Sequence, residues 1–111
     1  MTNIILCGCN GKMGHAVQNL VHQREECSIV AGVDITPQEA SPFPVYASLE
    51  AVQEQAQVVV DFSNPSALSS ILEYCRSHPG TAAVLCTTGY SAEQTQEIQK
   101  AAKELPLFYS R

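Results

Sequence analysis

The sequence contains few positively charged residues. Lysine and arginine together number 6 among 111 residues, against 11 aspartates and glutamates, which gives a formal net charge of −5. Nucleic acids and anionic membrane surfaces are bound by basic faces, so this composition argues against both as partners. Long apolar runs are also missing, because no stretch approaches the ~20 residues that span a bilayer. The first expected strand begins almost at the N-terminus and leaves no room for a signal peptide, so we expect a cytoplasmic protein.

The cysteines lack the pattern of a disulfide framework or a metal site. Their number, 5, is odd, and the chain shows no secretory feature. A Cys-x-Cys pair is present, but no second pair and no nearby histidine completes a zinc set. We therefore expect no bound metal, and we interpret the cysteines as small buried hydrophobic residues or neighbours of a glycine turn. They are Cys7, Cys9, Cys27, Cys75 and Cys86.

What the sequence does contain is a glycine turn between a strand pattern and a helix pattern. The turn, Gly8-Cys9-Asn10-Gly11-Lys12-Met13-Gly14, follows the apolar run Ile4–Cys7 and opens an amphipathic stretch that extends to Val21. Asp34 lies about 20 residues beyond the turn and closes a second apolar run. This layout is typical of a dinucleotide-binding βαβ unit, in which the backbone and helix N-terminus meet a pyrophosphate and the acidic residue meets a ribose. The spacing is G-x-x-G-x-x-G rather than G-x-G-x-x-G, so a bare glycine turn is the alternative.

Strand and helix patterns alternate along the whole chain. Such alternation predicts an α/β fold, here a Rossmann-like doubly wound parallel sheet in a three-layer α/β/α arrangement with about five strands, formed by residues 1–111. The expected strands are Asn3–Cys7, Ser28–Asp34, Val58–Phe62, Ala82–Cys86 and Leu107–Ser110, with Val45-Tyr46 as a short extended piece. The expected helices are Gly11–Arg24, Leu49–Gln55, 65–77 and Ala92–Lys103.

Local signals place the helix ends and the buried helix faces. Ser48 and Asn64 are expected to cap their helices, Pro65 to start one, and Ser91 with Gln94 to form a capping box. Helical spacing predicts three buried faces, listed by helix: Met13, Val17, Leu20 and Val21; Leu68, Ile71, Leu72 and Cys75; Ile98, Ala101 and Ala102.

The carboxyl ends of the expected strands carry the remaining candidates, because ligands of open parallel sheets bind there. Phe62 and Ser63 would flank the pyrophosphate or the nicotinamide ribose, and Thr87 with Thr88 would meet the nicotinamide. The alternatives stay open: Asp61 as a capping residue, and 87–89 as a plain turn. A nucleophilic role for Cys86 is disfavoured, because no histidine lies at any expected strand end.

Four segments together resemble the 4-hydroxy-tetrahydrodipicolinate reductase (dihydrodipicolinate reductase) family over the whole chain. They are Gly8–Gly14, Val60–Pro65, Cys86–Ser91 and Pro106–Ser110. The resemblance implies an NAD(P)H-dependent oxidoreductase that reduces 4-hydroxy-tetrahydrodipicolinate to tetrahydrodipicolinate, in lysine biosynthesis through diaminopimelate. It implies that this chain is the N-terminal cofactor domain.

The resemblance also assigns site residues. Cys86 replaces the family's usual glycine and Lys12 its more frequent arginine. Joined with the strand-end candidates, the expected cofactor-binding residues are Gly8, Cys9, Asn10, Gly11, Lys12, Met13, Asp34, Phe62, Ser63, Cys86, Thr87, Thr88, Tyr109 and Ser110.

The resemblance further implies that a second domain supplies the substrate site and a homotetramer. We expect no catalytic residue within 1–111, cofactor binding without turnover, and a monomer or weak dimer. Asp34 opposes a 2′-phosphate and no arginine follows it, so NADH is expected over NADPH. The alternative function is a stand-alone redox-sensing or regulatory module.

Overall fold

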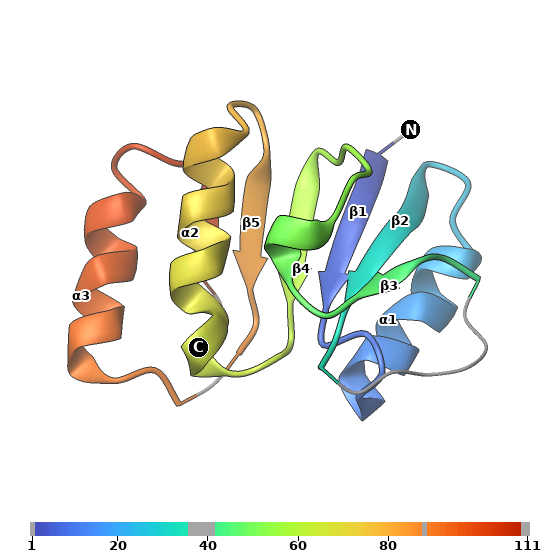
Figure 1. Ribbon diagram of the computed structural model, residues 1–111, viewed down its shortest axis with the longest axis horizontal. Coiled ribbons are helices and arrows are strands. Elements are labelled where there is room, and N and C mark those ends of the chain that lie inside the picture. Colours follow the sequence, from blue (N-terminus) through green and yellow to red (C-terminus); the bar gives the residue numbers. More distant parts are fainter. Residues whose placement is uncertain (1, 36–41, 88, 110–111) are drawn as a thin grey trace.

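The computed structural model describes residues 2–35, 42–87 and 89–109. Within them, six parallel strands form one sheet, and three α-helices pack against it (Figure 1). The strands are β1 (Thr2–Cys7), β2 (Cys27–Val33), β3 (Val45–Tyr46), β4 (Val58–Asp61), β5 (Ala82–Leu85) and β6 (Leu107–Tyr109). The helices are α1 (Lys12–His22), α2 (Leu68–Ser77) and α3 (Ala92–Ala101), with two 3₁₀ turns, η1 (Leu49–Ala51) and η2 (Pro65–Ala67). The predicted Rossmann-like α/β fold is confirmed, and β3 adds a sixth strand to the expected five.

The strand order places a crevice at the centre of the sheet. The order is β3-β2-β1-β4-β5-β6, which is the order of doubly wound dinucleotide-binding folds. The direction of winding reverses between β1 and β4, which pair from Ile4 with Val58 to Cys7 with Asp61. Loops leave the carboxyl ends of these two strands toward opposite faces, so this is the point at which such folds bind ligands.

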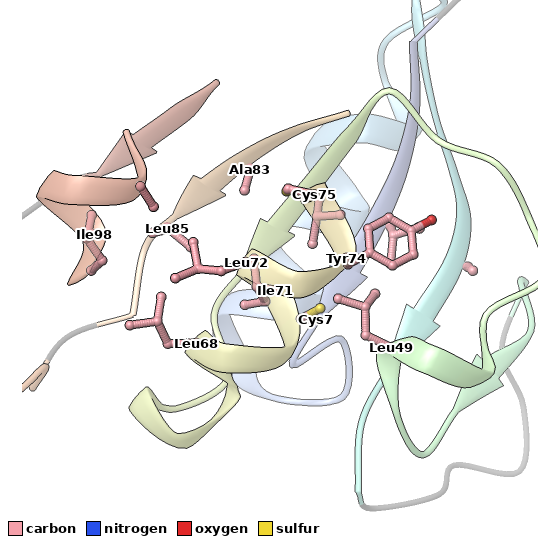
Figure 2. Close-up of a cluster of buried hydrophobic side chains, with 14 residues drawn as sticks. Cys7, Leu49, Leu68, Ile71, Leu72, Tyr74, Cys75, Ala83, Leu85 and Ile98 are labelled. Carbon is pink, nitrogen blue, oxygen red and sulfur yellow. The ribbon is translucent and has the colours of Figure 1, made fainter. Parts of the chain in front are cut away.

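Two hydrophobic cores lie on the two faces of the sheet. The larger core packs strand residues such as Ile5, Val59 and Ala83 against α2, α3 and η1 (Figure 2). The smaller core joins Leu6 to Cys9 and Phe43 on the face of α1. Strand β1 contributes Ile5 to the larger core and Leu6 to the smaller one, so its run of apolar residues is unbroken, as in parallel strands covered on both faces.

Two of the predicted helix starts are confirmed by their hydrogen bonds. The Asn64 side chain accepts from the Ser66 N–H at 2.9 Å, with Pro65 in the first turn. Ser91 and Gln94 form both hydrogen bonds of the capping box at the start of α3. These side chains satisfy N–H groups that helix geometry leaves without partners.

Other helix predictions are wrong in extent. The helix expected over Leu49–Gln55 is only the 3₁₀ turn η1, and the Ser48 side chain makes no capping hydrogen bond there. The ends of α1 and α3 lie at His22 and Ala101, two residues before the expected ends, and Ala102 is exposed rather than buried.

The buried face of α1 also differs from the prediction. Met13 is 57% exposed and Leu20 56% exposed, while Val17 and Val21 are partly buried. The helix instead buries Gly14, whose hydrogen-only side chain lets α1 approach the backbone of the glycine turn. Close backbone contact therefore replaces the expected packing of large side chains.

The structure also places the cysteines, of which only some are buried. All five cysteines are free; Cys7, Cys9 and Cys75 are buried as expected, whereas Cys27 and Cys86 are only partly buried. Among the described residues, no group of histidine, cysteine, aspartate and glutamate side chains could hold a metal ion. No helix in the described ranges is long and apolar enough to cross a membrane.

Candidate functional site

The three glycines of the turn have different structural tasks. Gly8 has φ +79°, and a Cβ there would lie 2.9 Å from the backbone of Phe62. A Cβ on Gly14 would lie 2.3 Å from the Gly8 carbonyl oxygen. Gly11 is different, because a Cβ there would be 3.6 Å from its nearest atom and its φ of −81° suits any residue. The fold needs the first and third glycines, whereas Gly11 leaves open space.

That open space lies at the N-terminus of α1. Gly11 is the N-cap residue and offers no side chain to the first N–H groups, and the first turn contains no acidic residue. The initial N–H groups of a helix need partners from outside it, and the helix dipole favours an anion there. The turn therefore presents an anion-binding helix N-terminus.

Asp34 is fixed beside this helix N-terminus. Its Oδ2 accepts a hydrogen bond of 3.0 Å from the Asn10 N–H, and its own N–H donates to the Tyr46 carbonyl. The glycine turn and β3 thus hold the carboxylate in place after β2. A carboxylate at this position accepts hydrogen bonds from ribose hydroxyls in dinucleotide-binding folds.

The first cavity connects these parts. It has a volume of ≈ 350 Å³ and lies at the carboxyl ends of β1, β2 and β4. Its walls include Gly8, Gly11, Asp34, Phe62 and Ser63. The glycine turn and the predicted acidic residue are therefore brought together around one space at the centre of the sheet.

A second cavity lies next to the first, at the carboxyl ends of β4 and β5. It has a volume of ≈ 460 Å³ and is lined by Met13, Phe62, Ser63, Asn64, Pro65, Cys86 and Thr87. Phe62, Ser63 and Asn64 line both cavities, so the loop after β4 forms the wall between them. The two cavities lie on either side of this loop, and we call them together the switch-point cleft.

The residues of the switch-point cleft fit a dinucleotide. An open helix N-terminus suits a pyrophosphate, a fixed carboxylate suits a ribose, and a space without a Cβ at Gly11 suits close backbone approach. The fit rests on these features of the chain itself.

Asp61, for which a capping role was the alternative, makes both a local contact and a long-range contact. It is fully buried, and its Oδ1 accepts from the Ser63 N–H at 3.0 Å and from the Ser63 hydroxyl. Its Oδ2 accepts from the Thr87 hydroxyl at 2.9 Å, a contact between the loops after β4 and β5. The capping contact is present, and a long-range contact is added to it.

The thiols near the cleft are held in their neutral form. Burial, and then the Asp34 carboxylate, raise the pKa of Cys9 to about 11. Burial, followed by the charge of Asp61, raises the pKa of both Cys7 and Cys86. Because the thiolate is the reactive form, this environment opposes nucleophilic chemistry at Cys86.

Some predicted site residues lie away from the described parts of the cleft. The Cys9 side chain is buried in the smaller core, against Gly32, and its carbonyl accepts from Gln18. Lys12 is exposed on α1, and Tyr109 packs against the larger core. Asn10 acts through its N–H on Asp34. Thr88 and Ser110 lie outside the described residues.

Sequence reasoning missed part of the walls of the first cavity. Ser48, Leu49 and Glu50 reach it from η1, and Ser66 and Ser70 from η2 and α2. The signal for the serines was their place just after a strand-end loop, at helical spacing. A helix was expected after Ser48, but no local signal places this segment at the cavity, because its position depends on the packing of Leu49 in the larger core.

Comparison with known proteins agrees with this geometry. The family profile described as "Dihydrodipicolinate reductase, N-terminus" matches residues 2–111. The chain is 43% identical over 110 residues to the 4-hydroxy-tetrahydrodipicolinate reductase of Clostridium novyi (strain NT), covering 99% of this chain and 43% of the relative. The chain thus spans less than half the length of that curated relative.

Solved structures with the same fold include a member of this family. A dipicolinate-bound dihydrodipicolinate reductase from Paenisporosarcina sp. TG-14 matches with a TM-score of 0.77 and 26% identity, over 92% of this chain and 43% of the other. A conserved hypothetical protein from Pyrococcus furiosus shares the fold with a TM-score of 0.73 at 15% identity, over 95% of its own length. The profile match over nearly the whole sequence shows that the chain belongs to the dihydrodipicolinate reductase family and corresponds to its N-terminal domain.

Proposed function

We propose that this chain is the dinucleotide-binding half of a 4-hydroxy-tetrahydrodipicolinate reductase. It holds NAD(P)H in the switch-point cleft, and the full-length enzyme reduces 4-hydroxy-tetrahydrodipicolinate in lysine biosynthesis. One observation supports this most strongly: the uncapped N-terminus of α1 and the fixed carboxylate of Asp34 line the same cavity at the point where the sheet reverses. The Clostridium novyi relative and the Paenisporosarcina structure are both reductases, so neither of them supports the stand-alone regulatory module.

Each part of the cleft has its own task in this proposal. The first N–H groups of α1 bind the pyrophosphate, and Asp34 accepts hydrogen bonds from the adenosine ribose. Phe62 and Ser63 separate the two halves of the cofactor, and Cys86 and Thr87 border the nicotinamide. The bound nicotinamide supplies the hydride.

The charges around the first cavity favour NADH over NADPH. Asp34 and Glu50 both line it, and no lysine, arginine or histidine occurs between Arg24 and Arg76. A 2′-phosphate would therefore meet carboxylates without a cation from this stretch. Unit charges about 4 Å apart repel by ~1 kcal/mol in water and ~4 kcal/mol near a protein surface, which predicts NADPH binding weaker by at least about fivefold.

Substrate binding and proton delivery belong, in this proposal, to sequence outside residues 1–111. The support is that the chain spans 43% of the length of the relatives, and that no lysine, arginine or histidine lines either described cavity. A dianionic substrate needs such cations. We propose that the remaining sequence forms the substrate domain and the homotetramer. Five free thiols fit the reducing cytoplasm in which such biosynthesis occurs.

The test is calorimetric titration of the chain with NADH and then NADPH. We expect NADH to bind more tightly, and Asp34→Ala or Gly11→Val to weaken NADH binding. Glu97→Ala, an exposed carboxylate of α3 away from both cavities, is the matched control and leaves binding unchanged. A folded chain that binds neither nucleotide would contradict the proposed function, and equal affinities would contradict the preference.

A further inference from the structure

The buried carboxylate of Asp61 links the two loops that enclose the second cavity. Asp61 ends β4, and its Oδ1 holds the backbone and hydroxyl of Ser63 in the next loop. Its Oδ2 accepts from the buried hydroxyl of Thr87, which follows β5. Phe62 and Ser63 form one wall of the second cavity, and Cys86 and Thr87 form another.

The position of Asp61 in the sheet makes burial of its carboxylate unfavourable for the free energy of folding. It lies in register with Cys7 of β1 and Leu85 of β5, and its side chain is 0% exposed. A buried carboxylate is tolerated only when its oxygens are well hydrogen-bonded, and an apolar residue would fill the same space at lower cost. The Ser63 contacts alone would form an ordinary Asx turn. The contact with Thr87 extends the carboxylate to the loop after β5, where the Cys86 N–H also donates to the Asp61 backbone carbonyl at 3.0 Å.

We propose that Asp61, through Thr87, is a positioning residue that holds the nicotinamide half of the switch-point cleft in its binding shape. This inference rests on the proposed function. The hydrogen bond between Asp61 and Thr87 fixes the distance between the Phe62–Ser63 wall and the Cys86–Thr87 wall. The glycine turn and Asp34, which bind the pyrophosphate and the adenosine ribose in the proposed function, are held by other contacts.

Tyr90 provides a second possible donor to the same carboxylate. Its hydroxyl is buried and makes no hydrogen bond with the described residues. Burial, and then the Asp61 charge, raise the pKa of Tyr90 to about 12, so the hydroxyl keeps its proton at neutral pH. If Thr87 loses its hydroxyl, Tyr90 can rotate to donate in its place. A decisive variant must therefore remove both hydroxyls.

The test compares NADH with ADP-ribose, which lacks the nicotinamide, in calorimetric titrations of the whole chain. The variant Thr87→Val/Tyr90→Phe removes both donors with little change in volume, and Thr87→Ser/Tyr90→Phe restores one. We expect the valine variant to bind NADH about tenfold more weakly than the wild type, because a displaced wall loses the nicotinamide contacts. We expect its ADP-ribose affinity to match the wild type, and the serine variant to match the wild type with both ligands.

The outcomes separate this inference from the proposed function. Unchanged NADH affinity in the valine variant overturns the positioning role while the proposed function stands. An equal loss of both ligands also overturns it, because the Asp61 contact would then support the whole domain. A wild-type chain that binds neither ligand overturns both proposals. Retained ADP-ribose binding shows that the variant is folded.

Discussion

At the scale of single residues, the glycines of the turn show how a motif mixes structural and functional demands. Gly8 and Gly14 are fixed by the fold, since any Cβ there meets backbone atoms within 3.0 Å. Gly11 has no such constraint and lines the first cavity. The same residue type therefore serves the fold at two positions and, in the proposed function, the ligand at the third.

The same substitution at Gly11 and Gly14 should have opposite effects on stability. Gly11→Ser adds a side chain that caps α1, so we expect equal or higher stability, by about a few tenths of a kcal/mol. The added atoms occupy the space at the helix N-terminus, and we expect NADH binding to weaken at least about tenfold. Gly14→Ser places a Cβ against the Gly8 carbonyl and should destabilise the chain by ~2–3 kcal/mol. Urea denaturation and calorimetric titration measure both quantities.

Each of these two predictions has its own contradicting outcome. Gly11→Ser binding NADH as the wild type does would show that the cofactor does not approach this N-cap. Gly14→Ser with unchanged stability would show that the turn can move away from α1, against the close contact between their backbones.

The thiol of Cys9 makes a prediction about pH. Its pKa is raised by burial from 9.0 to about 11 in the folded chain. Between these values the unfolded chain has lost a proton that the folded chain retains, so the free energy of unfolding decreases as the pH rises. The stabilising contribution is complete below pH 9 and is lost progressively toward pH 11.

Urea denaturation at several pH values from neutral to alkaline checks this sign. We expect Cys9→Ala to be less stable than the wild type at neutral pH, because it leaves a space against Gly32, and to lose less stability between pH 9 and 11. Val17→Ala is the matched control, since Val17 packs against the same smaller core and has no titratable group, so the slope should stay as in the wild type. Parallel slopes for all three proteins would contradict the role of the Cys9 thiol.

At the scale of secondary-structure elements, two serines with the same predicted role behave differently. Ser48 and Ser91 both precede helical patterns, yet only Ser91 accepts the N–H of the third helical residue. The difference follows from what comes next: Gln94 completes a capping box, and α3 buries Ile98 and Ala101. After Ser48, only one turn forms before Val52 adopts an extended conformation.

Alanine at these two positions measures the difference. Ser91→Ala should destabilise the chain by about 1 kcal/mol, because the Gln94 N–H loses the Ser91 hydroxyl as its acceptor. Ser48→Ala should change stability by less than about 0.5 kcal/mol, since no capping hydrogen bond is lost. Both are read by urea denaturation, and Ser91→Thr should retain most of the wild-type stability. Equal effects of the two alanines would contradict the capping geometry.

The misjudged face of α1 has a physical cause. The spacing of large apolar residues predicts the buried face of a helix, and Met13 and Leu20 have that spacing. The helix is placed instead by the short distance between Gly14 and the turn backbone, which rotates those side chains toward solvent. Periodicity reports which residues are apolar, but a contact made through a glycine leaves no such signal.

At the scale of the whole molecule, topology followed from the sequence because few arrangements satisfy alternating strands and helices. The chemistry at the ends of β1, β2 and β4 followed too, since parallel strands present their carboxyl ends on one edge. The sequence could not place Glu50 and Ser48 in the wall of the first cavity. The position of η1 in that wall depends on long-range packing of Leu49 in the larger core.

One half of the sheet remains partly exposed on the side of α1. Val60 of β4, Val84 of β5 and Phe108 of β6 follow one another in register on this face. The two valines are partly buried, and Phe108 is 62% exposed. The contacts of α1 are with β2, at the other half of the sheet (Figure 1). An apolar surface beside an edge strand favours association between copies.

We therefore expect this chain to self-associate weakly, and Phe108→Glu to reduce the association by placing a charge in the patch. Sedimentation velocity over a range of concentrations should show the average mass of the wild type rising with concentration, and that of Phe108→Glu staying close to a monomer. Leu20→Glu is the matched control, because Leu20 is similarly exposed, at 56%, but lies on α1. If all three proteins sediment as monomers throughout, or if Leu20→Glu acts as Phe108→Glu does, the patch at β4–β6 does not mediate contact between copies. If only Phe108→Glu abolishes the association, this half of the sheet is the surface through which the chain meets a second copy.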